Sequence, residues 1–435
     1  MRRAALIAAA LLLPLSAKAA DPRELVVYAG KPAPGWHVTL VGFEGQELTL
    51  EGEAVTIPKP GNALVPNGAV GAHPSDFAGR PDALTLQWKE AWSAGWRVEG
   101  GAPLDLRPYL AEGTLEFDIK VDELSRGGIY FVVRCGPECE RKLPYVVQGR
   151  ALQGQGWRHL AFAMSCFARA RDDFSHVTTP FGLYANGSGE VEVANVRFVR
   201  RGWPNAACPD YRTQALTPEP LLHAWSIGPW EQRHAAKLEE VRKLRAAGRN
   251  PQLVFVGDSI TEGWEKSGKP VWQEHYAKYD ALALGFGGDH TENVLWRLEH
   301  GEVDGIAPKV AVLMIGTNNT GDRRDEPEAT AAGVKRIVEE LRRRLPGTKV
   351  LLLAVFPRDA RPDTLFRRIN GQVNRLISGL ADGKTVFFAD INANLLDPDG
   401  SLSREVMPDL LHPNEKGYAI WARSMEPVLQ KLLKE

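Results

Sequence analysis

The hydrophobic and polar positions follow two different patterns along the chain, and the pattern changes near residue 203. Before that point, short runs of alternating apolar and polar residues are separated by Gly, Pro and Asn, and no long run has helical spacing. Short strands at such intervals predict an all-β sandwich. The predicted strands cover residues 24–28, 84–88, 95–98, 114–121, 128–134, 157–163 and 190–199.

The second pattern begins after a segment, residues 203–229, that contains five prolines and is predicted to be a linker. Beyond it, apolar runs typical of buried parallel strands alternate with stretches of helical spacing. The runs cover residues 253–256, 282–285, 310–315, 350–355 and 386–389, and the helical stretches cover 238–244, 334–345, 365–380 and 418–432. This alternation predicts a three-layer α/β domain around a five-stranded parallel sheet.

The first nineteen residues have the layout of a secretory signal peptide. Arg2 and Arg3 precede an apolar run, and Ala17-Lys18-Ala19 supplies a small-x-small cleavage site. The apolar run is too short to cross a bilayer of about 30 Å. We therefore expect a secreted protein, periplasmic or extracellular, without a stable membrane anchor. Its expected parts are a signal peptide (1–19), a β-sandwich (25–202), the linker (203–229) and an α/β domain (230–435).

Composition narrows the classes of partner. The 435 residues carry 53 basic and 54 acidic groups, and removal of residues 1–19 would leave a net charge of −4. A mildly acidic chain gives no reason to expect a nucleic-acid partner. An oxidising compartment would permit disulfides among the four cysteines. Cys135 and Cys139 could close a small loop, whereas Cys166 and Cys208 could pair or stay as buried thiols.

Polar residues with complementary chemistry stand after three predicted strands and before the last helix. Ser259 follows the first strand, Gly288 the second and Asn318 the third, while Asp409 and His412 precede the final helix. A serine hydroxyl is a weak nucleophile and needs a base such as histidine, which a carboxylate can orient. Backbone N–H groups and a side-chain amide can stabilise an oxyanion.

Each of these clusters alone has an ordinary structural interpretation. A Gly-Asp-Ser turn is usually a capped helix start, and Asp258 there most simply accepts backbone hydrogen bonds. Asp-x-x-His is also common at surfaces and helix caps. Their order along the chain favours a serine hydrolase, because together they fill all the roles that such an enzyme requires.

In this order and spacing, Gly257-Asp258-Ser259, Gly288, Gly316-x-Asn318 and Asp409-x-x-His412 resemble the four signatures of SGNH (GDSL-type) hydrolases. The resemblance covers about residues 225–435, and Gly287-Gly288-Asp289 with Val294–Leu298 is similar to the platelet-activating-factor acetylhydrolase α-subunit-like branch. It implies a flavodoxin-like fold, Ser259 as nucleophile, His412 as base and Asp409 as its orienter. The implied oxyanion donors are the N–H groups of Ser259 and Gly288 and the Asn318 amide.

The same resemblance implies no cofactor and no metal. The choice of Gly288 over Gly287 rests only on its place directly before Asp289. One departure is His290, which stands where a small hydroxyl residue is frequent and could alter the edge of the pocket.

The front half resembles the galactose-binding-like domain of some family 3 β-glucosidases, an all-β jelly-roll-like sandwich. The resemblance lies mainly in core strands, such as residues 114–121 and 194–199, so it indicates fold more than ligand. Six of the 12 tryptophans lie in this half. Exposed rings could stack on sugars, but alternation of Trp88, Trp92 and Trp96 fits a sandwich core better.

The leading hypothesis is a secreted carboxylic-ester hydrolase that removes acetyl or other short acyl groups, with carbohydrate as the substrate. A lipid-directed esterase or lysophospholipase is the second hypothesis. The third is a carbohydrate-binding protein whose hydrolase domain is inert. Across these hypotheses, the expected ligand is a small molecule, a polysaccharide or a lipid. A carbohydrate could also bind the N-terminal domain.

Overall fold

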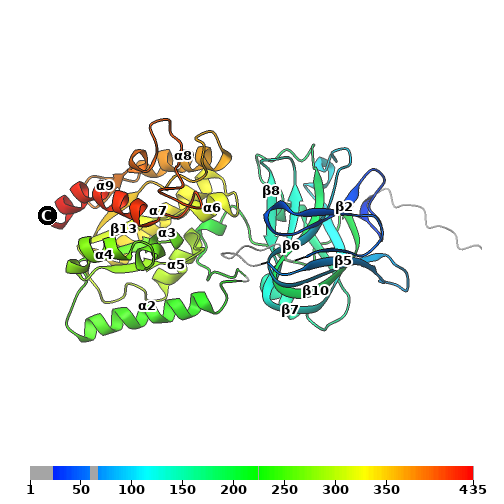
Figure 1. The fold of residues 1–435 in the computed structure, drawn as a ribbon, viewed down its shortest axis with the longest axis horizontal. Coiled ribbons are helices and arrows are strands. Elements are labelled where there is room, and N and C mark those ends of the chain that lie inside the picture. Colours follow the sequence, from blue (N-terminus) through cyan, green and yellow to red (C-terminus); the bar gives the residue numbers. More distant parts are fainter. Residues whose placement is uncertain (1–22, 59–66, 224, 435) are drawn as a thin grey trace, which may run out of the picture.

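The computed structural model describes residues 23–58, 67–223 and 225–434, which form two domains side by side (Figure 1). The β domain comes first in the chain and the α/β domain second. The proposed signal peptide lies outside the described residues. In the part of the chain that the structure describes, no helix is both long enough and apolar enough to cross a membrane.

The N-terminal domain is an antiparallel network of strands, as the sequence predicts. Its central order is β3-β2-β6-β10-β7-β8, with β1 on β10, β4 on β5, β5 on β6 and β9 on β7. The strands are β1 (Glu24–Tyr28), β2 (His37–Val41), β3 (Glu47–Leu50), β4 (Val55–Ile57), β5 (Val70–Ser75), β6 (Ala83–Glu99), β7 (Thr114–Arg134), β8 (Glu140–Pro144), β9 (Arg158–Ala163) and β10 (Thr179–Val199).

Three strands are much longer than the sequence pattern indicates. The predicted strands 84–88 and 95–98 are two parts of β6, and 114–121 and 128–134 are two parts of β7. Both long strands pair with β10 on either side of register shifts near Asn186 and Ser188. At Glu90 the backbone adopts φ +51°, so β6 bends there without ending. A polar interruption that resembles a turn in the sequence is therefore a bend inside a strand.

The tryptophan pattern divides between core and surface. Trp88 and Trp96 are buried, and the Trp96 ring packs 5.6 Å from Tyr28 and 5.2 Å from Phe181 between centroids. The core interpretation is therefore correct for these two. In contrast, Trp92 on β6 is 61% exposed, and Trp203, just after the sandwich, is 91% exposed.

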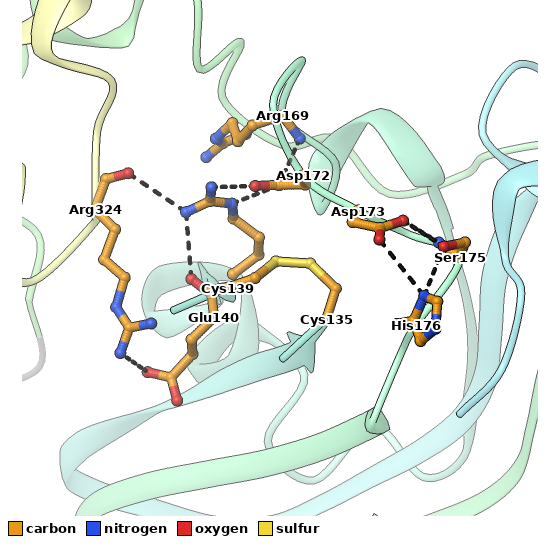
Figure 2. The surroundings of a disulfide bond; sticks show 10 residues. Cys135, Cys139, Glu140, Arg169, Asp172, Asp173, Ser175, His176 and Arg324 are labelled. Atoms are coloured by element: carbon orange, nitrogen blue, oxygen red, sulfur yellow. Dashed lines mark hydrogen bonds and ion pairs between the residues drawn. A yellow bond between two sulfur atoms is a disulfide. The ribbon is translucent and has the colours of Figure 1, made fainter. Parts of the chain in front are cut away.

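All four cysteines form disulfides. Cys135 pairs with Cys139 in the turn between β7 and β8, and Cys166 pairs with Cys208. Figure 2 shows the first bond beside Asp172 and beside Arg324, a residue of the α/β domain. The guanidinium of Arg141 donates to the Asp172 carboxylate (Nε, 2.7 Å) and to the Arg324 carbonyl oxygen (Nη1, 3.3 Å), which joins the two domains at this point.

The C-terminal domain contains the five parallel strands that the sequence predicts, in the order β12-β11-β13-β14-β15. They are β11 (Leu253–Gly257), β12 (Leu282–Gly285), β13 (Val310–Met314), β14 (Lys349–Leu353) and β15 (Val386–Ala389). Helices α4 (Lys269–His275) and α9 (Glu415–Lys434) pack on one face of the sheet. Helices α2 (Pro229–Ala246), α5 (Thr291–Glu299), α7 (Pro327–Arg344) and α8 (Leu365–Ser378) pack on the other. The three-layer α/β fold is confirmed.

The two short helices α3 (Ser259–Glu262) and α6 (Thr317–Gly321) begin where β11 and β13 end. Because parallel strands deliver their carboxyl ends to one edge of the sheet, the loops after β11, β12 and β13 meet there. Ser259 begins α3, Gly288 lies in the loop after β12, and Asn318 lies in the first turn of α6.

Candidate active site

Ser259 is held at the start of α3 by its neighbour in sequence. Asp258 is the N-cap of this helix, and its Oδ1 accepts a hydrogen bond from the Ile260 N–H at 3.0 Å. Asp258 is fully buried, whereas Ser259 is partly exposed. The turn therefore fixes the backbone and presents the serine side chain at the edge of the sheet.

The structure brings Ser259, His412 and Asp409 together. The Ser259 Oγ lies 2.9 Å from the His412 Nε2, and the His412 Nδ1 lies 2.6 Å from the Asp409 Oδ2. This places the imidazole between a hydroxyl and a carboxylate, with one ring nitrogen toward each. In that arrangement the carboxylate favours the tautomer with its proton on Nδ1, which leaves Nε2 free to accept the serine proton.

The loop that carries Asp409 and His412 is fixed by the carboxylate itself. The other oxygen, Asp409 Oδ1, accepts from the N–H groups of Leu411 (3.0 Å) and His412 (2.7 Å). Leu410 has a φ of +61°, an uncommon conformation for a non-glycine residue. Although burial opposes it, hydrogen bonding to His412 lowers the pKa of Asp409 to about 2. The orienting group is therefore ionised at any pH at which a neutral histidine could act.

The loop after β12 offers one free backbone donor. The Gly287 N–H donates to the Glu262 Oε2 at 2.6 Å, while the Gly288 N–H has no hydrogen-bond partner among the described residues. The Asn318 Nδ2 donates one hydrogen to the Asp289 carbonyl oxygen at 2.8 Å, which leaves its second hydrogen available. This geometry favours Gly288 over Gly287 as an oxyanion donor, and it orients the Asn318 amide.

Trp225 is a part of this site that the sequence analysis missed. Gly288 has a φ of +83°, and a β-carbon at this position would lie 2.6 Å from the Trp225 ring. The ring is 46% exposed. Trp225 thus forms an apolar wall over the oxyanion loop, yet it comes from the segment predicted as a linker. Trp225 shares that proline-rich stretch with Trp203 and Tyr211, and nothing in the sequence distinguishes it from them.

A buried ion network lies beneath the oxyanion loop. Asp289, Arg297 and Glu302 are each fully buried, and the Arg297 guanidinium pairs with both carboxylates (Nε to Asp289 Oδ2, 2.8 Å). Arg297 also donates from Nη2 to the Gly257 carbonyl oxygen at 3.2 Å, and the Trp230 Nε1 donates to Asp289 at 2.6 Å. The network therefore joins the loop that carries Ser259 to the loop that carries Gly288.

Replacing Arg297 with methionine should destabilise the protein strongly. The substitution leaves two carboxylates buried without a cation, and breaking such a pair costs about 3–5 kcal/mol of unfolding free energy. Urea unfolding of the purified variant measures this loss. Arg242→Met, which removes an exposed guanidinium paired with Glu239 on α2, is the matched control and should change the midpoint little. Equal midpoints for the two variants would contradict the prediction.

Asp258 should make stability depend on pH. Burial raises its pKa to about 7, against the hydrogen bond from the Ile260 N–H, while an aspartate in an unfolded chain has a pKa of about 3.9. Because the folded state holds the proton more tightly, this group's contribution is fully present below about pH 4. It is lost as the pH rises through about 7.

The asparagine of the Asp258→Asn variant does not titrate. The melting temperature of the variant minus that of wild type should therefore rise between pH 4 and pH 8. Differential scanning calorimetry at several pH values measures the difference. Asp397→Asn, at an exposed position, is the matched control. A pH-independent difference for Asp258→Asn would contradict the expected burial effect.

The α/β domain holds a serine, a histidine and an aspartate in a hydrogen-bonded sequence beside oriented N–H donors. These are the groups that a hydrolase of ester bonds requires. Comparison with known proteins gives the same class of enzyme. Residues 255–420 match the GDSL-like lipase/acylhydrolase family, and residues 52–198 match a galactose-binding domain-like family. The chain belongs to the GDSL-like lipase/acylhydrolase family, and its N-terminal domain has the galactose-binding-like fold.

Among curated relatives, the human platelet-activating factor acetylhydrolase IB subunit alpha1 is 33% identical over 220 residues, which are 50% of this chain and 90% of the relative. A solved structure described as a putative platelet activating factor from Streptococcus pneumonia is 25% identical, with a TM-score of 0.39, and covers 47% of this chain and 96% of its own. The extra C-terminal domain of an exo-1,3/1,4-beta-glucanase from a Pseudoalteromonas species is 14% identical, with a TM-score of 0.33, and covers 42% and 95%.

Proposed function

We propose that the chain is a secreted serine esterase that removes acetyl or other short acyl groups from carbohydrate. The observation that carries the proposal is the hydrogen-bonded sequence Ser259–His412–Asp409 beside the Gly288 N–H and the Asn318 amide. Ester hydrolysis follows from the family. The acyl group, the alcohol and the compartment are the parts that we add.

In the proposed mechanism, the Ser259 Oγ attacks the ester carbonyl carbon while the His412 Nε2 takes its proton. The carbonyl oxygen becomes an oxyanion held by the N–H groups of Ser259 and Gly288 and by the Asn318 Nδ2. The intermediate then collapses to an acyl-serine, and His412 returns the proton to the departing alcohol. Water, deprotonated by His412, attacks the acyl-serine, and the acid leaves as Ser259 regains its proton.

Three features support the choice of substrate and compartment. The human relative is a platelet-activating factor acetylhydrolase subunit, which supports a short acyl group. A galactose-binding-like domain stands next to the hydrolase domain, which supports a carbohydrate alcohol. Two disulfides are typical of an oxidising compartment, in keeping with the signal-like residues 1–19.

A lipid-directed esterase is the second candidate, and one observation favours it. Two exposed apolar side chains lie near the site. Trp225 lies over the oxyanion loop, and Leu222 lines the same cavity as His290. Exposed apolar groups beside a site could take an acyl or alkyl chain. The description of the family, which names lipases, is in keeping with this candidate.

A substrate panel separates the two candidates. The full chain would be assayed for acetate release from acetylated xylan, acetylated glucomannan and acetylated pectin, and for hydrolysis of a micellar phospholipid with an acetyl ester. The proposal predicts the highest kcat/KM on an acetylated carbohydrate, with activity falling as the acyl chain of 4-nitrophenyl esters lengthens from acetyl to octanoyl. A preference for the phospholipid or for long acyl chains would replace it with the second candidate.

A further inference from the structure

A cavity of about 130 Å³ lies between the two domains. The β domain contributes polar and apolar side chains from β8 and from α1 (Val146–Ala151), and the segment before α2 contributes Leu222 and His223. The α/β domain contributes His290 and Asp322. Residues lining the cavity that the following argument uses are Lys142, His223, His290, Asp322 and Arg323.

Three polar side chains converge at this cavity without bonding to one another. The Nε2 atoms of His223 and His290 each lie 3.7 Å from the Asp322 Oδ2, beyond hydrogen-bond distance, and the ligand atoms of all three lie within 4.8 Å. The His290 side chain is 3% exposed, and its Nε2 has no hydrogen-bond partner among the described residues. An oxygen atom placed between the three could lie about 2.8 Å from each.

The charge state of the cluster indicates what that oxygen belongs to. Burial lowers the pKa of His223 to about 4, with Asp322 opposing the shift and His290 and Arg323 adding to it, so this imidazole is neutral at pH 7. The Arg323 guanidinium is engaged by Glu292 and Asp325 and is not offered to a ligand. A hydroxyl group fits two imidazoles and a carboxylate, because its oxygen can accept a hydrogen bond from an imidazole N–H and its hydrogen can be donated to the carboxylate.

Short connections lead from the wall of the cavity to the oxyanion donors. His290 directly follows Asp289, whose carbonyl oxygen accepts from Asn318. The Asp322 N–H donates to the Asn318 carbonyl oxygen at 2.9 Å. The His223 ring lies 6.3 Å from the Trp225 ring, which covers Gly288. These contacts join the wall of the cavity to the segments that carry Gly288 and Asn318.

Charged contacts join the β domain to the α/β domain. Arg171 pairs with Glu326 (3.1 Å) and Glu328 (2.9 Å), and Arg368 pairs with Glu138 (2.7 Å). Figure 2 shows Arg324 next to Glu140, with Nη2 and Oε1 separated by 4.0 Å. Lys142, two residues further along β8, lines the cavity.

We propose that this cavity binds the alcohol half of the substrate, a sugar ring whose hydroxyl group lies between His223, His290 and Asp322. Lys142 of the β domain also lines the cavity. The β domain is then a part of the substrate site and not a separate tether. The inference rests on the carbohydrate substrate of the proposed function.

The test compares two substrates on the full-length protein. His290→Leu and Lys142→Met would be assayed on acetylated xylotriose and on 4-nitrophenyl acetate, and the ratio of the two kcat/KM values would be calculated. Loss of one ligand hydrogen bond at a buried group predicts a fall in this ratio of about tenfold for His290→Leu. Lys89→Met, an exposed lysine on β6 outside the cavity, is the matched control and should leave the ratio unchanged. Circular dichroism melting checks that each variant is folded.

The outcomes separate the two proposals. If wild type hydrolyses acetylated xylotriose and both cavity variants keep the wild-type ratio, the inference is wrong and the proposed function stands. If wild type hydrolyses 4-nitrophenyl acetate but no acetylated sugar, the carbohydrate substrate fails and the inference with it. A zinc titration by calorimetry is a third arm. Tight binding of one zinc ion that His290→Leu abolishes would identify the cluster as a metal site and overturn the sugar assignment.

Discussion

Replacing Ser259 with alanine should lower kcat on 4-nitrophenyl acetate by about 10⁴- to 10⁶-fold, the range found when the nucleophile of a serine hydrolase is removed. The reason is the geometry of the hydroxyl, whose Oγ lies 2.9 Å from the His412 Nε2 and is the atom that forms the acyl bond. The remaining oxyanion donors should support only a small residual rate. Steady-state kinetics on the purified variant measure the effect.

Two controls make this result specific. Ser267→Ala removes an exposed hydroxyl from the same domain and should leave kcat unchanged. A fluorophosphonate probe should label wild type at Ser259, identified by peptide mass spectrometry, and should not label Ser259→Ala. Retained turnover in the alanine variant would exclude the acyl-serine mechanism, and an unlabelled wild type would revive the inert-domain hypothesis.

Replacing Asp409 with asparagine should lower kcat by about 10²- to 10⁴-fold with a smaller effect on KM. The carboxylate accepts from the His412 Nδ1 at 2.6 Å and from two backbone N–H groups. An amide has only one acceptor oxygen, so it can hold the loop or the imidazole tautomer but not both. The expected loss is smaller than for Ser259 because the histidine can still reach the nucleophile.

The matched control is Asp399→Asn, another exposed aspartate whose carboxylate accepts a backbone N–H, from Ser401 at 2.9 Å. It should retain wild-type kcat. Wild-type kcat in Asp409→Asn would mean that a different carboxylate orients His412, and the buried Asp258 beside the nucleophile would become the candidate to test next.

The sequence predicts the α/β domain well because its strands are continuous apolar runs buried on both faces. The predicted strands 282–285 and 386–389 coincide with β12 and β15. The β domain is harder, since its strands bend and carry polar residues in mid-strand. The stretch around Glu90 resembles a turn, yet hydrogen bonding to β10 continues on both sides of it. The local sequence pattern cannot show that a strand continues beyond a polar stretch that resembles a turn.

For the site, the motif order places the reacting residues, while their surroundings depend on tertiary contacts. In the sequence, only its place directly before Asp289 favours Gly288 over Gly287; in the structure, Glu262 accepts a hydrogen bond from the Gly287 N–H, which favours Gly288 on independent grounds. Trp225 and His223 lie on a segment without regular structure, so no periodicity marks them. His290 differs from the family pattern in the sequence, and in the structure it lines the interdomain cavity.

The Cys166–Cys208 bond has a consequence for how the protein must be produced. Its partners are 42 residues apart, and closing such a loop stabilises a folded chain by about 4 kcal/mol. Ala207 and Pro209, which flank Cys208, line the interdomain cavity. Expression in a reducing cytoplasm would leave this part of the wall unanchored, whereas export to an oxidising compartment would fasten it. Preparations from the two compartments could then agree on 4-nitrophenyl acetate and differ on bulky esters, so the redox history of a sample belongs with its kinetic constants.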